Sequence, residues 1–190
     1  MCNAVGNIFR LVITLGGLLA LALQFLVTYD CAFLDFTANG NSLASIGLWF
    51  LGVSGECLTD SSFDPPNDDG LIQGARSCLI LSMIFGGGAL VLVIFEWFCC
   101  QICCAGMIEG IGFAGAWILG SSVYMVYGLD ICQNPGGTTV EIPGFGDLDL
   151  STSTCEWGSG ATFNICAVIC WLGCGVLLCC APQPEPICTK

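Results

Sequence analysis

The sequence predicts an all-α transmembrane four-helix bundle. Hydrophobic residues make up 55% of the chain and charged residues only 9%, and the mean hydropathy is +0.85. A water-soluble domain of 190 residues could not bury so many apolar side chains in one core. Four apolar runs are each long enough to cross a bilayer, which takes about 20 residues. They cover 8–28, 75–98, 105–129 and 161–180.

Each run is expected to be a complete span. The first is interpreted as a retained helix, because it is longer than the apolar part of a signal peptide and Thr28-Tyr29-Asp30 is a poor cleavage site. The second contains Gly86-Gly87-Gly88, and the third contains Gly106-x-x-x-Gly110. Such small residues let neighbouring helices approach closely in lipid.

The connections between the runs differ in length and polarity. Residues 29–74 and 130–160 form two long polar loops, whereas 99–104 is so short that the second and third helices must form a tight antiparallel hairpin. The tail, 181–190, contains three prolines and is expected to be disordered. Short apolar pieces at 32–36 and 48–53 predict strands in the first loop. The whole chain is expected to be one integral membrane domain, 1–190.

Cysteine positions predict the orientation of the chain. Four spans place both termini on one side, but Lys and Arg are too few for the positive-inside rule to decide which side. The long loops contain an even set of cysteines, Cys31, Cys57, Cys132 and Cys155. Because disulfides form in oxidising compartments, we expect these loops outside the cell or in a lumen and the termini in the cytosol.

Three ionisable residues lie within the predicted spans: Arg10, Glu96 and Glu109. Each lies about one helical turn from the cytosolic end of its helix. Charges within a membrane are costly and usually find partners, so we predict that Arg10 pairs with Glu96 or Glu109. The alternative is that each side chain reaches separately for the membrane surface.

The two long loops are strongly acidic and hold 12 of the 15 Asp and Glu residues. The formal net charge of −12 disfavours nucleic acid as a partner. Clustered carboxylates could bind a hard cation such as calcium. Candidate ligands are Asp64, Asp68, Asp69, Asp147 and Asp149. The alternative is a solvated acidic surface, since neither cluster matches an EF-hand.

Several cysteines lie at the cytosolic ends of the helices, where S-palmitoylation occurs. The candidates are Cys99, Cys100, Cys103, Cys104, Cys179 and Cys180. A zinc site from Cys100-x-x-Cys103 is the less favoured alternative, because so short a turn cannot easily surround one ion. Cys78 and the series Cys166, Cys170 and Cys174 are interpreted as packing residues.

No pattern in the sequence indicates catalysis. The chain has no histidine, no phosphate-binding loop and no nucleophile with an adjacent base, so we expect neither an enzyme nor a small-molecule substrate. The letters of Gly110-Ile-Gly112-Phe-Ala-Gly115 match a dinucleotide fingerprint. They lack the preceding strand that such a site requires.

Residues of the first loop and of the start of the second span resemble the claudin and peripheral-myelin-protein superfamily. The matching residues are Gly47-Leu48-Trp49 followed by a cysteine, then Gln73, Ala75 and Arg76. The resemblance implies a left-handed four-helix bundle whose two outer loops build a small antiparallel sheet. Trp49 is expected to anchor that sheet at the membrane surface.

The sequence departs from the family in its cysteines and its tail. Claudins have two cysteines closely after Gly-Leu-Trp, whereas here only Cys57 follows and Cys31 precedes. From this departure we hypothesise bridges Cys31–Cys57 and Cys132–Cys155, with cross-loop pairing as the alternative. The tail also lacks the ending by which junction proteins recruit scaffolds.

The resemblance implies a non-catalytic protein of the plasma membrane. We expect a structural or accessory subunit that contacts other membrane proteins, or copies of itself, laterally and through its outer loops. The alternative is a cation-selective pore or paracellular channel, formed by an oligomer and lined by the acidic loops. Apart from lipid, attached palmitate or calcium, no cofactor is expected.

Overall fold

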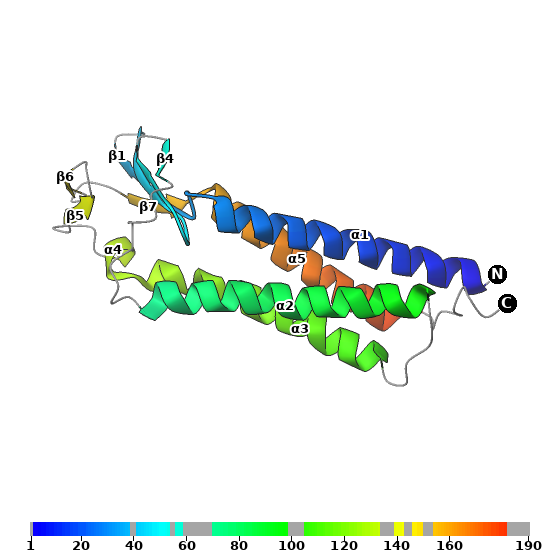
Figure 1. Ribbon diagram of the computed structural model, residues 1–190. Helices are drawn as coiled ribbons and strands as arrows, with labels where there is room; N and C mark the ends of the chain where they lie inside the picture. The colour runs from blue at the N-terminus through cyan, green and yellow to red at the C-terminus, as the bar shows by residue number, and fades with distance from the viewer. Residues whose placement is uncertain are drawn as a thin grey trace. The chain divides into compact units, whose positions relative to one another are not determined.

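A computed structural model describes residues 2–38, 41–53, 56–58, 70–98, 105–133, 139–142, 146–149 and 154–181 (Figure 1). Its long helices are α1 (Cys2–Tyr29), α2 (Gly70–Phe98), α3 (Ala105–Ser122) and α5 (Ser159–Cys180). A 3₁₀-helix, η1 (Val123–Gly128), continues α3, and a short helix, α4 (Asp130–Gln133), follows it. Strands lie in both long loops. They are β1 (Leu34–Ala38), β2 (Asn41–Ile46), β3 (Leu51–Val53), β4 (Glu56–Leu58), β5 (Thr139–Ile142), β6 (Gly146–Asp149) and β7 (Thr154–Trp157).

The prediction of a multi-pass membrane protein is confirmed. Four helical segments are long and apolar enough to cross a membrane: Val5–Tyr29, Gly70–Phe98, Ala105–Gly128 and Ser159–Cys180. The second begins five residues before the predicted start at 75, so the helix includes Arg76 in its second turn. The third tightens from α-helix to 3₁₀-helix after Ser122, as helix ends often do. The connection 99–104 and the tail beyond 181 lie outside the described residues.

The buried residues of α1 and α2 recur at alternating intervals of three and four residues. In α1 they are Gly6, Arg10, Ile13, Gly17, Ala20, Gln24 and Val27; in α2 they are Ile72, Ala75, Leu79, Ser82, Gly86, Ala89, Val93 and Glu96, and Leu90 is buried outside this series. Exposed positions between them are equally apolar, among them Leu15, Leu18 and Ile84. The inner face therefore differs from the outer face by small and polar side chains rather than by hydrophobicity.

Contacts divide the chain into two compact units, and each takes residues from all four spanning segments. The first unit comprises 1–24, 78–121 and 165–190. Its core gathers around Trp171 and Phe113, both fully buried, with ring centroids 5.8 Å apart. Trp171 lies flat against α2 at Gly86, where an added Cβ would come within 2.5 Å of the indole ring. A larger residue at Gly86 would displace the largest side chain of the core.

The second unit comprises 25–77 and 122–164 and contains a five-stranded antiparallel sheet. The strand order is β4-β3-β2-β1-β7, so the second long loop adds β7 beside β1. A register shift interrupts the β1–β2 pair between Phe36 and Thr37. Strands β5 and β6 form a separate two-stranded sheet. The antiparallel sheet implied by the family resemblance is present, and both loops contribute to it.

The strands predicted from the apolar pieces were only partly right. The piece 32–36 overlaps β1, but only the last three residues of 48–53 form a strand, β3. Gly47 to Phe50 instead make the turn between β2 and β3, closed by a hydrogen bond from Gly47 N to Phe50 O of 2.8 Å. Strand β2, Asn41–Ile46, was missed because its polar start does not show the alternation of a half-buried strand.

Two disulfides join the strands to neighbouring segments, and both follow the predicted pairing. Cys31, just before β1, is bonded to Cys57 in β4, and their Cα atoms are 5.8 Å apart. Cys132 in α4 is bonded to Cys155 in β7, with Cα atoms 5.3 Å apart. Each bridge stays within one loop, so the cross-loop alternative is not the arrangement found.

Two glycines of α3 give a matched test of the packing. An added Cβ at Gly112 would lie 2.7 Å from the Cβ of Ala89 and 3.1 Å from the carbonyl oxygen of Phe85, whereas one at Gly110 would meet nothing within 4 Å in the described part of the chain. We expect Gly112→Ala to lower the free energy of unfolding by about 1–3 kcal/mol, because overpacking forces α2 and α3 apart. Gly110→Ala should change it little. Equilibrium unfolding in mixed micelles measures both, and equal effects would contradict this packing.

Candidate functional site

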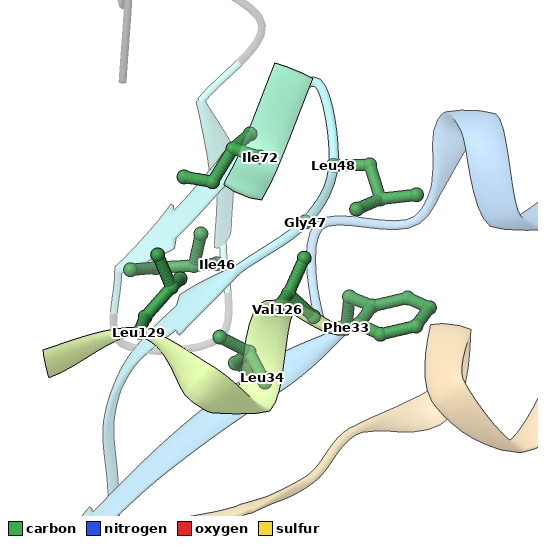
Figure 2. Close-up of a pocket in the computed structure, with 8 residues that line it drawn as sticks. All are labelled: Phe33, Leu34, Ile46, Gly47, Leu48, Ile72, Val126 and Leu129. Atoms are coloured by element: carbon green, nitrogen blue, oxygen red, sulfur yellow. The ribbon is translucent and has the colours of Figure 1, made fainter. Parts of the chain in front are cut away.

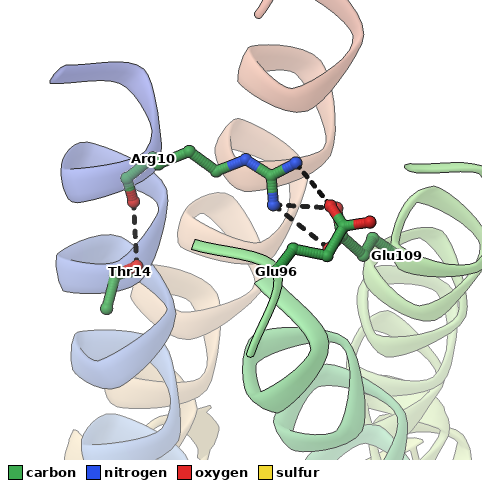
Figure 3. Close-up of polar contacts among 4 residues, drawn as sticks. All are labelled: Arg10, Thr14, Glu96 and Glu109. Carbon is green, nitrogen blue, oxygen red and sulfur yellow. Dashed lines mark hydrogen bonds and ion pairs between the residues drawn. The ribbon is translucent and has the colours of Figure 1, made fainter. Parts of the chain in front are cut away.

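The first candidate site is a buried cluster of charged side chains in the first unit. Arg10 of α1 contacts Glu96 near the end of α2 and Glu109 in the second turn of α3 (Figure 3). Arg10 Nη2 donates to Glu96 Oε2 at 2.8 Å, and Arg10 Nη1 donates to Glu109 Oε1 at 3.2 Å and Oε2 at 3.4 Å. The predicted ion pair is therefore found, with both glutamates rather than one.

Burial makes this cluster structurally important. Arg10 is only 4% exposed, Glu96 6% and Glu109 0%. Each charge would be costly alone in such surroundings. The guanidinium stabilises both carboxyl groups at once and so joins α1 to α2 and α3. The alternative prediction, that each side chain reaches separately for the surface, does not describe these contacts.

A second polar layer, which sequence reasoning missed, joins all four helices. Gln24 Nε2 donates to Ser82 Oγ at 2.8 Å, Ser82 Oγ donates to the carbonyl oxygen of Ala116 at 2.7 Å, and Trp171 Nε1 donates to Gln24 Oε1 at 3.2 Å. Gln24, Ser82 and Trp171 are fully buried. In lipid such bonds contribute to helix association, by about 0.6 kcal/mol each on average.

The signal for this second layer was in the sequence. Gln24 follows Arg10 by two heptads, and Ser82 precedes Glu96 by two heptads. In antiparallel helices whose inner faces repeat every seven residues, these spacings bring Gln24 opposite Ser82 whenever Arg10 lies opposite Glu96.

The second candidate site is the family motif, in the second unit. Gly47 begins a turn that passes so close to the chain at Asp30 and Cys31 that a Cβ would lie 2.9 Å from the Cα of Cys31. Arg76 of α2 donates from Nε to the carbonyl oxygen of Leu48 at 2.6 Å, and its guanidinium lies 5.9 Å from the ring centre of Trp49. The Arg76 side chain thus holds the turn in two ways: by the hydrogen bond to the backbone of Leu48 and by the cation–π contact with Trp49.

Leu48 is buried, whereas Trp49 is half-buried. Leu48 lies on the edge of an apolar pocket of about 10 Å³, shown in Figure 2. Such a volume is at the limit for a single water molecule, and apolar walls leave such cavities dry. We therefore interpret the pocket as packing space and not as a ligand site. Its lining residues are Phe33, Leu34, Ile46, Gly47, Leu48, Ile72, Val126 and Leu129.

An aromatic cluster, also missed from the sequence, lies in the second unit between η1 and the strands. Tyr124 and Tyr127 of η1 both contact Phe33 and Trp157, with ring centroids 5.8–6.4 Å apart. Tyr124 donates to the carbonyl oxygen of Ala161 at 2.6 Å, and Tyr127 to that of Phe33 at 3.3 Å. The 3₁₀-helix thereby contacts the residue before β1, strand β7 and the start of α5.

The remaining predicted residues are only partly described. Asp64, Asp68 and Asp69 lie outside the described residues, as do Cys99, Cys100, Cys103 and Cys104. Asp147 and Asp149 are in β6, of which only the backbone is described. Cys179 and Cys180 are exposed at the end of α5, Cys78 is half-buried, and Cys174 is buried against Ile13. Within the described ranges, no three acidic, cysteine or histidine side chains are grouped to hold a metal ion.

Comparison with known proteins adds no assignment: no family model matches the chain, and no curated protein matches it.

Arg10 and its outward-facing neighbour Leu11 provide a test of the charged cluster. Arg10→Leu leaves two carboxyl groups buried without a cation, and breaking a buried pair in this way costs about 3–5 kcal/mol. We expect a corresponding loss in the free energy of unfolding, measured in mixed micelles. Leu11→Ala removes a side chain that is 45% exposed and should have little effect. An Arg10→Leu variant as stable as the wild type would show that the cluster does not hold α1 to the other helices.

The turn at Gly47 is tested at Arg76. Arg76→Met keeps an apolar stem but loses the bond to Leu48 O and the contact with Trp49. Hydrogen bonds from charged donors contribute about 1.5–3 kcal/mol, so we expect a lower midpoint of thermal unfolding and faster proteolysis between β2 and β3. The control is Ser77→Ala, because the Ser77 hydroxyl is exposed and donates to Gln73 O of its own helix. If both variants behaved alike, Arg76 would not hold the turn.

Proposed function

We propose that this chain is a non-catalytic, claudin-like four-span membrane protein that acts as a structural or accessory subunit. The observation that carries the proposal is that two sets of polar and charged side chains buried between the helices bind one another. Arg10 is bound by two carboxyl groups from two other helices, and Gln24 by Ser82 and Trp171. Polar groups that bind one another between helices hold the helices together.

The outer face of α3 supports lateral contacts with other membrane proteins. Gly106 and Gly110 lie on this face, and a Cβ at either would meet nothing within 4 Å in the described part of the chain. The sequence predicted that this pair allows close approach of a neighbouring helix, and the glycines of α3 that lie against other helices of the chain are Gly112, Gly115 and Gly120. Small residues left uncovered on a spanning helix allow close approach by a helix of another protein.

The geometry of the family motif supports claudin-like membership. The resemblance rested on a few matching residues, and Arg76 contacts both Leu48 and Trp49 although it follows Trp49 by 27 positions. We further propose a left-handed bundle, which the alternation of three and four residues between buried positions favours. The two loop disulfides favour loops on the oxidising side of the plasma membrane and cytosolic termini. Exposure of Cys179 and Cys180 is compatible with palmitate at the end of α5.

The test is to identify what the protein assembles with. We would extract the protein gently from its native membrane and determine the mass and composition of the complex by native mass spectrometry. A larger membrane protein bound in fixed stoichiometry is the expected result. Gly110→Leu should disrupt this association if the outer face of α3 binds the partner, because it fills the space that a partner helix would occupy. Gly173→Leu, at an equally open position on α5, is the matched control.

The alternative outcomes are distinct. A homo-oligomer without other chains would favour the second candidate, a cation-selective pore lined by the acidic loops, and would call for conductance measurements. A monomer without any partner would contradict both functions. Loss of association with both glycine variants would indicate a general effect of the added leucine and not a specific face.

A further inference from the structure

The cluster of Arg10, Glu96 and Glu109 contains one basic and two acidic side chains. One guanidinium binds two carboxyl groups, and Figure 3 shows both reaching the same end of the Arg10 side chain. Arg10 Nε finds no hydrogen-bond partner in the described part of the chain. With both carboxyl groups ionised, the cluster would carry one uncompensated negative charge among buried side chains, which is costly.

No other side chain of these helices supplies a compensating positive charge. Residues 1–24, 78–121 and 165–180 contain no Lys, Asp, Glu or Arg besides these three. The titratable groups of α5 are thiols, which are neutral or negative; they are Cys166, Cys170, Cys174, Cys179 and Cys180. Glu96 also lies two residues before the end of α2 at Phe98, where the free carbonyl groups of the helix carry partial negative charge.

The two carboxyl groups are close to each other as well as to Arg10. Glu96 Oε2 lies 2.8 Å from Arg10 Nη2 and Glu109 Oε1 lies 3.2 Å from Arg10 Nη1, so both carboxyl groups meet at one guanidinium (Figure 3). An ionised carboxylate can only accept hydrogen bonds, and two of them repel each other at this range. A hydrogen bond between them requires a proton on one of the two.

We propose that this cluster is a proton-binding site, in which Glu96 and Glu109 share one proton taken up from solvent and Arg10 balances the remaining negative charge. With the proton bound, the cluster is neutral and joins α1, α2 and α3. Release of the proton at higher pH leaves a net negative charge between the helices and weakens their association. The site thus couples the stability of the bundle to proton concentration.

Infrared spectroscopy of the full chain in lipid tests the bound proton directly. At about pH 7 exposed carboxyl groups are ionised, since their usual pKa lies near 4. We therefore expect the C=O stretching band of one protonated carboxylic acid per chain, shifted in deuterium oxide. Glu96→Gln and Glu109→Gln should each abolish the whole band, because the carboxyl group that remains is then balanced by Arg10. Glu156→Gln, at an exposed acid of β7, should leave it unchanged.

The pH dependence of unfolding gives a second measurement. A folded state that holds one proton more than the unfolded chain becomes less stable as pH rises, and the equilibrium constant of unfolding increases about tenfold per pH unit. We expect this slope above the range in which exposed carboxyl groups titrate and below the range in which free thiols titrate. It should disappear in Glu96→Gln and in Glu109→Gln, while Glu156→Gln retains it.

The results that overturn the proposal are equally specific. A wild-type spectrum without the band would show that both carboxyl groups are ionised, and a band that persists in both single variants would place the proton elsewhere. Stability that depends on sodium concentration and not on pH would assign the compensating charge to a metal cation. If the variants failed to fold, the wild-type band and its deuterium shift would still decide whether a proton is bound.

Discussion

The contact of Arg10 with Glu96 and Glu109 is the interaction on which the arrangement of the first unit depends. Between lipid and protein there is little hydrophobic gain in bringing helices together, so association relies on close packing and on polar contacts. The guanidinium binds two helices at once, and the layer of Gln24, Ser82 and Trp171 repeats the principle two heptads away. Glycines and alanines between the two layers allow the close packing that lets these side chains meet.

The spans could be predicted because hydropathy and length are sufficient for that purpose. Which face of each helix points inward could not, because Leu15 and Leu18 on the outside are as apolar as Ile13 and Val27 on the inside. The inner faces are marked by small residues and by rare polar residues, which recur at alternating intervals of three and four positions. The sheet was harder still. Its strands are short, β2 begins with polar residues, and the apolar Leu48 lies in a turn because Gly47 must approach the chain near Asp30.

The candidate sites, too, could be predicted from the sequence only in part. The partners of Arg10 were predictable, since an intramembrane cation has few acids to choose from. That it would bind both acids was not, because the sequence does not say how α2 and α3 turn toward α1. Gln24 and Ser82 were overlooked as ordinary residues of apolar runs, although their spacing from Arg10 and Glu96 places them on the same faces. The tyrosines of η1 lacked any signal, since their partners Phe33, Trp157 and Ala161 are distant in sequence.

The sequence separations within the charged cluster have a consequence for synthesis of the protein. Glu96 follows Arg10 by 86 residues and Glu109 follows it by 99. At about 5–20 residues per second, the first helix exists for roughly 5–20 seconds before the ribosome has made both acids. During that time Arg10 has no carboxyl partner from the helices, and its position close to the start of α1 lets it stay near the lipid headgroups. Glu96 and Glu109 are made close together in time, because both belong to the hairpin of α2 and α3. Arg10 can therefore gain both carboxyl partners in one step.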